Sequence, residues 1–147
     1  MADKIVVDTC VFIRALFTPE DDDECTLFIN ALDRYDARLV FSQYTIGELL
    51  YMIKKISNEI NSPYEHMRKK LDYISFLFQH AKSVNTSHTK SDFTATDRND
   101  QMFVDAAVES DANHIITIDL KSGILEMQDA PFIPMKPIDY FLKHGVK

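Results

Sequence analysis

Glycine is scarce in this sequence, which contains only Gly47, Gly123 and Gly145. A P-loop needs two glycines in one short loop, and a dinucleotide-binding turn needs three at G-x-G-x-x-G spacing. Three isolated glycines satisfy neither pattern, so the sequence excludes both kinds of nucleotide site. The 147 residues also hold no segment rich in glycine, proline or serine and no internal repeat, which predicts one domain over residues 1–147.

Cysteine is equally scarce, with Cys10 and Cys25 alone. Two cysteines are too few for a disulfide framework, so we expect both to be reduced, as in the cytoplasm. The five histidines show no spacing typical of zinc ligands, and the sequence predicts no structural zinc site. No serine–histidine or cysteine–histidine pairing is apparent either, which argues against covalent nucleophilic catalysis.

Long apolar runs and an excess of basic residues are also lacking. No run approaches the length of a membrane span, and MADKIVVD lacks the basic start and apolar stretch of a signal peptide, so we expect a cytoplasmic protein with no membrane partner. The net charge of -7 argues against a protein that coats nucleic acid. It does not exclude a nuclease, because clustered carboxylates are strongly negative until divalent cations enter.

Hydrophobic patterning predicts an α/β protein. Short β-branched or apolar runs predict strands at residues 5–7, 38–41, around 84, 114–118 and 131–134, the last at a sheet edge because of its prolines. Amphipathic patterns predict helices after residue 8 and over 25–35, 44–60, 64–79, from about 100, and 137–144. This alternation predicts a short, mainly parallel sheet flanked by helices on both faces.

Asp8 interrupts the first apolar run, KIVVDTCVFI, where a charged residue is costly unless it is paired, capping or metal-bound. Asp8 or Thr9 could cap the following helix, or Asp8 could be a metal ligand at the carboxyl end of the first strand. A capping side chain and a strand-end ligand occupy the same place, so the two interpretations are compatible.

Two more acids come from the stretch DRNDQMFVDAAVESDANHIITID. Asp100 heads the apolar stripe of a helix, and Asp119 ends a strand. In an open parallel sheet, strand carboxyl ends and helix amino ends share the edge where ligands bind. Asp97 and Asp100 could instead be only a cap and a first-turn acid, and Asp119 only a turn residue.

Glu48 is less clearly placed by its pattern. It lies off the main apolar stripe of its helix, on a mixed face, and Thr45 to Glu48 matches a capping box. The pattern alone therefore predicts a cap or a surface residue.

Asp8, Asp100 and Asp119 map to one edge of the predicted sheet. Converging carboxylates repel one another unless they bind hard cations, and oxygen-only ligation suits magnesium or manganese. A two-metal carboxylate site suits phosphodiester cleavage.

Four segments of the chain resemble the PIN domain family and, within it, the VapC-like toxin nucleases. They are IVVDTCVFI, FSQYTIGELL, DRNDQMFVDAAVESDANHIITID and FIPMKPIDYFL. The resemblance covers nearly the whole chain. Asp111, Asn113 and Ile118 depart from it, because the closest group often has Gly, Asp and Gly there, but the acids are intact.

The resemblance implies a magnesium- or manganese-dependent endoribonuclease, a hydrolase that cuts RNA with metal-activated water. It also implies a small antitoxin as partner, and often a homodimer. The metal ligands it implies are Asp8, Glu48, Asp100 and Asp119. Thr9 and Thr117 would orient carboxylates, Asp97 would support them, and Arg14 and Arg98 would meet RNA phosphates.

Three alternatives remain at this point. One is a catalytically silent PIN fold that serves as an RNA- or protein-binding scaffold. Another is a phospho-acceptor receiver-like domain, although the paired early acids and the strand-end lysine are missing. A HAD-type phosphatase fits poorly, because Cys10 stands where the second acid of its Asp-x-Asp motif belongs.

Overall fold

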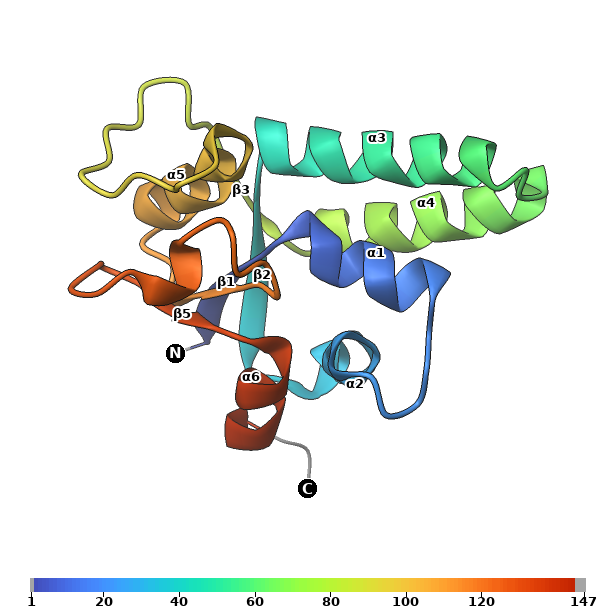
Figure 1. The fold of residues 1–147 in the computed structure, drawn as a ribbon, viewed down its shortest axis with the longest axis horizontal. Helices are drawn as coiled ribbons and strands as arrows, with labels where there is room; N and C mark the ends of the chain where they lie inside the picture. The colour runs from blue at the N-terminus through green and yellow to red at the C-terminus, as the bar shows by residue number, and fades with distance from the viewer. Residues whose placement is uncertain (1, 145–147) are drawn as a thin grey trace.

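Five parallel strands form the centre of the computed structural model, which describes residues 2–144 (Figure 1). They are β1 (Asp3–Val7), β2 (Ala37–Ser42), β3 (Lys82–Val84), β4 (His114–Ile116) and β5 (Ile133–Met135). Their order is β3-β2-β1-β4-β5, and each neighbouring pair is parallel. The predicted α/β sheet is confirmed, with its proline-containing last strand at an edge.

Six α-helices and three 3-10 helices surround the sheet within the described residues. The α-helices are α1 (Thr9–Phe17), α2 (Glu24–Asn30), α3 (Gln43–Glu59), α4 (Tyr64–Gln79), α5 (Gln101–Ser110) and α6 (Pro137–His144). The 3-10 helices are η1 (Leu32–Arg34), η2 (Arg98–Asp100) and η3 (Ile124–Glu126). Helices α3 and α4 form a long antiparallel hairpin (Figure 1). Within residues 2–144, no helix combines the length and apolar composition that a membrane span requires.

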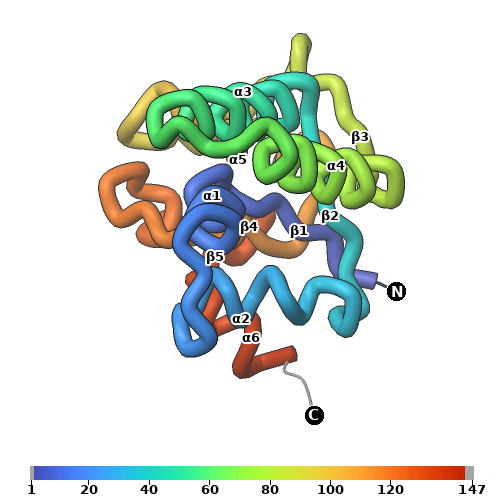
Figure 2. Tube along the Cα trace, turned by 90° about the vertical axis from the view of Figure 1, so that its right-hand side faces the viewer, coloured from blue at the N-terminus to red at the C-terminus, as the bar shows by residue number. Residues whose placement is uncertain are grey.

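The core lies on both faces of the sheet. On one face of the sheet, the side chains of Phe12, Phe28 and Ile53 pack with buried residues of β1 and β2. Helices α1 to α4 and α6 cover this face. Figure 2 shows α3 and α4 above α1, with α2 and α6 below it. On the other face, Phe103 and Val104 of α5 pack on the opposite side of β1 and β4. The predicted placement of helices on both faces is therefore confirmed.

The connections place a topological switch point beside β1. The chain leaves β1 toward β2 and β3, then returns through α5 to form β4 on the other side of β1. Val7 is paired with Ile116 at the carboxyl ends of the two strands. Open α/β sheets bind ligands in the crevice outside such ends, so the residues just after Val7 and Ile116 are the first candidates for a site.

The predicted helix over residues 25–35 is wrong in its second half. Helix α2 ends at Asn30, and the chain tightens into η1. This tighter path packs the ring of Tyr35 against Phe28 and Tyr140, at centroid distances of 5.5 and 5.0 Å. The packing of these aromatic rings stabilises the tighter path more than a continued α-helix would be stabilised by its periodic apolar residues. Aromatic pairs add about 0.5–1.5 kcal/mol beyond the contribution of their buried area.

The two late strands are shorter or shifted relative to their predictions. Strand β4 ends at Ile116 instead of residue 118, and β5 spans Ile133–Met135 instead of residues 131–134. Thr117 still donates a backbone hydrogen bond to Met135, at 3.1 Å, but its side chain already turns the chain out of the ladder. The apolar run in the sequence continues to Ile118, one residue past Thr117, which is why the predicted strand is too long.

Asp111 and Asn113, two of the departures from the PIN pattern, fit the turn between α5 and β4. Asp111 closes α5 in the left-handed conformation (φ 55°, ψ 43°), which a short polar side chain tolerates better than most. The side-chain oxygen of Asn113 accepts a hydrogen bond from the Lys4 N–H at 2.8 Å. The substituted turn thus still joins β4 to β1.

Candidate active site

Asp8 follows β1 directly and is buried, with 4% of its surface exposed. Its extended backbone caps α1, and Oδ1 accepts a 3.4 Å hydrogen bond from the N–H of Cys10. Its other oxygen, Oδ2, accepts a 2.7 Å hydrogen bond from the hydroxyl of Thr117. Asp8 is therefore a helix cap and a strand-end carboxylate at the same time, as the two compatible interpretations allowed.

Asp119 is placed by the same threonine. Its N–H donates to Thr117 Oγ1 at 3.0 Å, so one buried hydroxyl holds the Asp8 side chain and the Asp119 backbone. The Asp119 carboxylate in turn accepts from the N–H of Lys121 at 2.8 Å. This turn directs the carboxylate to the carboxyl end of the β1–β4 pair.

Asp100 enters from the helical side of the cleft. It ends η2 and stands at the N-cap position of α5, where its own side chain makes no capping hydrogen bond. The cap of η2 is Asp97, whose Oδ1 accepts from the N–H of Asn99 at 2.9 Å. The local capping role therefore falls on Asp97, and the Asp100 carboxylate is available to the cleft.

The three predicted acids converge. One carboxylate oxygen from each of Asp8, Asp100 and Asp119 lies within 4.8 Å of the other two. They line a cleft of about 450 Å³, which Thr9 and Glu48 also line. Residues up to 111 positions apart thus meet at the switch point of the sheet.

The crowding of carboxylates is reflected in their pKa values. Burial raises the pKa of Asp100 to about 7, assisted by the negative charges of Asp8, Asp119 and Asp97. Burial also raises the pKa of Asp8, although the hydrogen bond from Thr117 opposes this. A divalent cation among these groups would favour their charged forms. The site therefore stores charge repulsion that cation binding would relieve.

Glu48 lies in the cleft, but not among the three acids that meet most closely. Its Oε2 accepts a 3.4 Å hydrogen bond from the hydroxyl of Thr9. Burial raises its pKa, and the charge of Asp8 adds to this effect while Thr9 opposes it. Glu48 therefore faces the acid cluster from α3, at its margin.

The predicted capping box from Thr45 to Glu48 is wrong. Helix α3 begins at Gln43, because Ser42 leaves β2 in an extended conformation and caps the helix immediately. The Ser42 hydroxyl accepts from the N–H of Thr45 at 3.1 Å, and the Thr45 hydroxyl accepts from the N–H of Ser42 at 2.9 Å. Glu48 is thereby released from capping and can face the cleft.

Three apolar side chains complete the cleft: Ile118, already noted as a departure from the PIN pattern, and Ile13 and Met52, which the sequence did not single out. Met52 lies one helical turn after Glu48, and Ile13 one turn after Thr9, so helical spacing was the signal that could have found them. Cys10 also lines the cleft, and burial raises its pKa, helped by the charge of Asp8. A protonated thiol is a poor nucleophile, so Cys10 contributes to the wall and not to the chemistry.

The two predicted RNA-binding arginines have different surroundings. Arg14 is paired with Asp23 at 2.6 Å, and that carboxylate also caps α2. Arg98 is exposed in η2, next to Asp97 and two residues before Asp100. Arg98 is therefore the one of the pair that stands beside the acids with its side chain in solvent.

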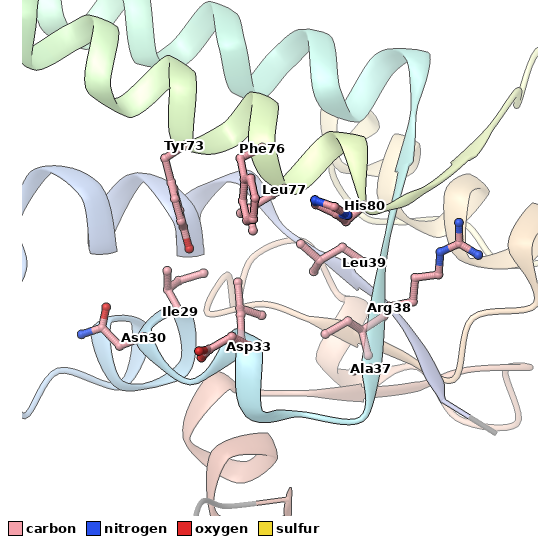
Figure 3. Close-up of a pocket in the computed structure, with 12 residues that line it drawn as sticks. Ile29, Asn30, Asp33, Ala37, Arg38, Leu39, Tyr73, Phe76, Leu77 and His80 are labelled. Atoms are coloured by element: carbon pink, nitrogen blue, oxygen red, sulfur yellow. The ribbon is translucent and has the colours of Figure 1, made fainter.

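The larger cavity of the molecule lies elsewhere. It has a volume of about 610 Å³ and is bounded by α2, η1, β2 and α4 (Figure 3). Its lining is mostly apolar, with Leu39, Tyr73 and Leu77 among its side chains. Asp33 is its one lining carboxylate, so this cavity lacks a carboxylate cluster that could hold a cation.

Comparison with known proteins agrees with this geometry. The family model for the PIN domain matches residues 4–121, a span that includes all the acids of the cleft. The chain belongs to the PIN domain family. No curated protein sequence matches this PIN domain.

The fold also has a counterpart among solved structures. The crystal structure of VapBC2 from Rickettsia felis, bound to a DNA fragment from their promoter, contains a chain that matches with a TM-score of 0.58. The match covers 90% of the PIN domain described here and 98% of that chain, at 14% identity. At this identity the likeness shows a shared fold.

The receiver-like alternative is excluded, because a flavodoxin-like sheet has the order 2-1-3-4-5 and this sheet has β3-β2-β1-β4-β5.

The donor set fits a hard divalent cation. Asp8, Asp100 and Asp119 offer carboxylate oxygens and no nitrogen or sulfur, which suits magnesium or manganese. An uncompensated cluster of this kind is unfavourable, as the raised pKa of Asp100 indicates. The residues present therefore match the divalent metals that PIN nucleases use.

Proposed function

We propose that this PIN domain is a magnesium- or manganese-dependent endoribonuclease and the toxin of a toxin–antitoxin pair. The observation that carries the proposal is the convergence of Asp8, Asp100 and Asp119 within 4.8 Å at the switch point of the sheet. The PIN family match and the fold shared with a VapBC2 chain support the same activity. A silent scaffold would have no use for three mutually repelling carboxylates.

Each residue of the cleft has a distinct task in this proposal. Asp8, Asp100 and Asp119 would hold the metal, and Glu48 would add a fourth carboxylate from the margin. The bound cation would supply an activated water and stabilise the leaving oxygen of the phosphodiester. Thr117 fixes the orientation of Asp8, and Thr9 fixes that of Glu48. Asp97 supports η2, which carries Asp100 into the cleft.

RNA would approach along the side of the cleft that carries Arg98. The overall charge of -7 opposes a polyanion, so the attraction must be local and must come from cations. Arg98, Lys121 and bound metal are positive groups near the acids, and Lys121 lies two residues after Asp119. Arg14 would contribute only if RNA displaced it from Asp23.

The decisive experiment compares RNA cleavage by two aspartate variants. Asp8→Asn removes one charge from the cleft, whereas Asp105→Asn removes one from α5 outside it, where the carboxylate accepts a hydrogen bond from Gln101. With single-stranded RNA and manganese or magnesium, we expect cleavage by the wild type and Asp105→Asn. Asp8→Asn should lose about a hundredfold or more, because loss of a ligand should cost at least as much as loss of the groups that support ligands, which is typically 10–100-fold.

The other outcomes of this experiment have clear meanings. Absence of cleavage by all three proteins would favour the scaffold. Equal cleavage by all three would indicate a contaminating nuclease. Parallel reactions on single-stranded DNA of the same sequence decide whether RNA is the preferred substrate.

The partners follow from the toxin assignment. We propose a small antitoxin that covers the protein and a homodimer as its resting assembly, in the cytoplasm. A short reading frame overlapping the start of this gene would support the pair. Co-expression with that frame, followed by co-purification, tests the antitoxin, and light scattering of the purified protein tests the dimer.

A further inference from the structure

A second group of metal-ligating side chains lies at the opposite end of β1 and β4. Asp3 opens β1, His114 opens β4, and His144 ends α6, on the side where the described chain begins and ends (Figure 1). One ligand atom from each of the three lies within 4.8 Å of the others. Asp3 Oδ2 is 3.9 Å from His114 Nε2 and 3.8 Å from His144 Nε2. These distances exceed those of hydrogen bonds, so the three atoms face one another without being bonded.

His114 is prepared as a ligand by its other ring nitrogen. Nδ1 lies 3.0 Å from the carbonyl oxygen of Ile133. A carbonyl only accepts, so Nδ1 carries the proton and Nε2 presents its lone pair toward Asp3. The ring is 5% exposed, and burial lowers its pKa. Histidines that bind metals commonly donate their second ring N–H to a backbone carbonyl in this way.

His144 has a buried nitrogen that the protein leaves unsatisfied. Among residues 2–144, His144 Nε2 is enclosed and has no hydrogen-bond partner. The ring is held in place by stacking on Tyr140, with centroids 4.1 Å apart and planes inclined by 24°. The hydroxyl of the same Tyr140 donates to Asp3 Oδ2 at 3.2 Å, which orients the carboxylate. A buried nitrogen without a hydrogen-bond partner is unfavourable, and a bound ligand would compensate for it.

We propose that Asp3, His114 and His144 bind one zinc ion, with water as the fourth ligand. Two imidazoles and one carboxylate form a donor set that suits zinc and disfavours magnesium, which prefers oxygen alone. Zinc bonds of about 2.0–2.2 Å place the ligand atoms of a tetrahedral site roughly 3.4 Å apart. The two distances from Asp3 need to shorten by roughly half an ångström to reach that spacing, and the two histidine ligand atoms, which lie within 4.8 Å of each other, by at most roughly 1.4 Å. The ion would tie α6 to the amino ends of the two central strands, away from the acid cleft.

The site was hidden from spacing arguments because its members come from both termini and the middle of the chain. Zinc motifs are recognised by ligands a few residues apart. The sequence prediction of no structural zinc site rested on that criterion and on the scarcity of cysteine. Asp3, His114 and His144 come close together only in the folded structure, although they are far apart in the sequence.

The test measures zinc binding by the full-length, tag-free protein in an Asp100→Asn background, with magnesium in excess. These conditions suppress zinc binding at the acid cleft. After dialysis against zinc chloride, metal analysis should find one zinc per chain, and zinc should raise the melting temperature by about 5 °C or more at a hundredfold excess over its Kd. His144→Ala should remove both effects, whereas His66→Asn, an exposed histidine of α4, should retain them.

Several results would overturn the proposal. One is absence of zinc from the dialysed protein, and another is equal zinc content in the His144→Ala and His66→Asn variants. Asp3→Asn, which is isosteric, provides a second variant should His144→Ala fold poorly, and circular dichroism checks both. In the wild-type background, His144→Ala should leave RNA cleavage within about twofold, because the zinc group lies at the far end of the strands from the acids.

Discussion

The hydroxyl of Thr117 donates a 2.7 Å hydrogen bond to Asp8, a residue 109 positions earlier in the chain. Both side chains are buried, and the same hydroxyl accepts from the Asp119 backbone at 3.0 Å. Thr117 therefore sets the relative positions of two acids that come from different strands. Loss of the Thr117 hydroxyl should therefore disturb the positions of both acids, although the side chain is small.

We predict that Thr117→Val destabilises the protein by about 1–3 kcal/mol, because a buried oxygen of Asp8 loses its donor. RNA cleavage should fall about 10–100-fold, since metal sites depend on such supporting hydrogen bonds. Thr117→Ser keeps the hydroxyl and should retain most of the activity. Urea denaturation and cleavage assays on both variants measure the two effects, and equal activity of the valine and serine variants would refute this role.

The pKa of Asp100, raised to about 7, predicts a pH-dependent stability without metal. Between about pH 4 and pH 7 the folded protein binds more protons at Asp100 than the unfolded chain does, so its contribution to stability falls as pH rises. Asp100→Asn removes this titration. In metal-free buffer the variant should match the wild type near pH 5 and exceed it near pH 8, by on the order of 1 kcal/mol after solvent screening. A difference that is the same at both pH values contradicts the prediction.

Divalent metal should reverse that pH trend. Magnesium or manganese competes with protons for the carboxylates, so binding strengthens as pH rises through the pKa of Asp100. We expect the melting temperature of the wild type to rise with metal, and to rise more at pH 8 than at pH 6. At a hundredfold excess over the Kd, one ion adds about 2.7 kcal/mol. Asp8→Asn should abolish most of the rise, and a metal-induced rise that persists in that variant would locate the cation elsewhere.

Gly123 and Gly47 form a matched pair for testing the loop beside the acids. Gly123 has a φ of 77°, and an added Cβ would lie 2.5 Å from Thr96 Oγ1, whereas a Cβ at Gly47 would meet nothing within 4 Å. Gly123→Ala should destabilise by about 1–2 kcal/mol or more. It should also lower cleavage, because Thr96 leads into η2. Gly47→Ala lies within α3 and should stabilise by about 0.5–1 kcal/mol. Thermal unfolding of both variants measures the contrast.

Arg98 and Arg14 should differ in their effect on RNA binding. Arg98→Ala should weaken binding of a non-cleaved RNA and reduce the slope of log affinity against log salt by about 1. Arg14→Ala should leave that slope unchanged and cost about 1–3 kcal/mol of stability, because it leaves the Asp23 carboxylate, whose side chain is 8% exposed, without its cation. Fluorescence anisotropy at several salt concentrations distinguishes them. Equal slopes for both variants would remove Arg98 from the interface.

The convergence of Asp8, Asp100 and Asp119 could be predicted from the sequence because their positions follow from element ends. Each lies where a buried strand or helix begins or ends, and parallel topology brings such ends to one edge. Glu48 was harder, since its place depends on where α3 starts. In the sequence Ser42 is either a turn residue or a cap, and the structure shows that it caps the helix. The apparent capping box from Thr45 to Glu48 therefore has the wrong register.

Other features depend on contacts between distant segments and had no local signal. The end of α2 at Asn30 is set by the packing of Tyr35 against Phe28 and Tyr140. The pairing of Arg14 with Asp23 requires the acidic loop to fold back on α1. Helical periodicity reports which face is buried, but not which partner covers it. These are the places where the sequence prediction fell short.

The pairing of Asp8 with Thr117 also has a consequence for biosynthesis. Asp8 leaves the ribosome 109 residues before its partner Thr117, and Asp119 follows that threonine. Contacts between such distant segments close late in folding. A nascent chain that has not yet reached Asp119 therefore cannot assemble the acidic cleft, and the proposed cleavage has to wait until both segments have left the ribosome.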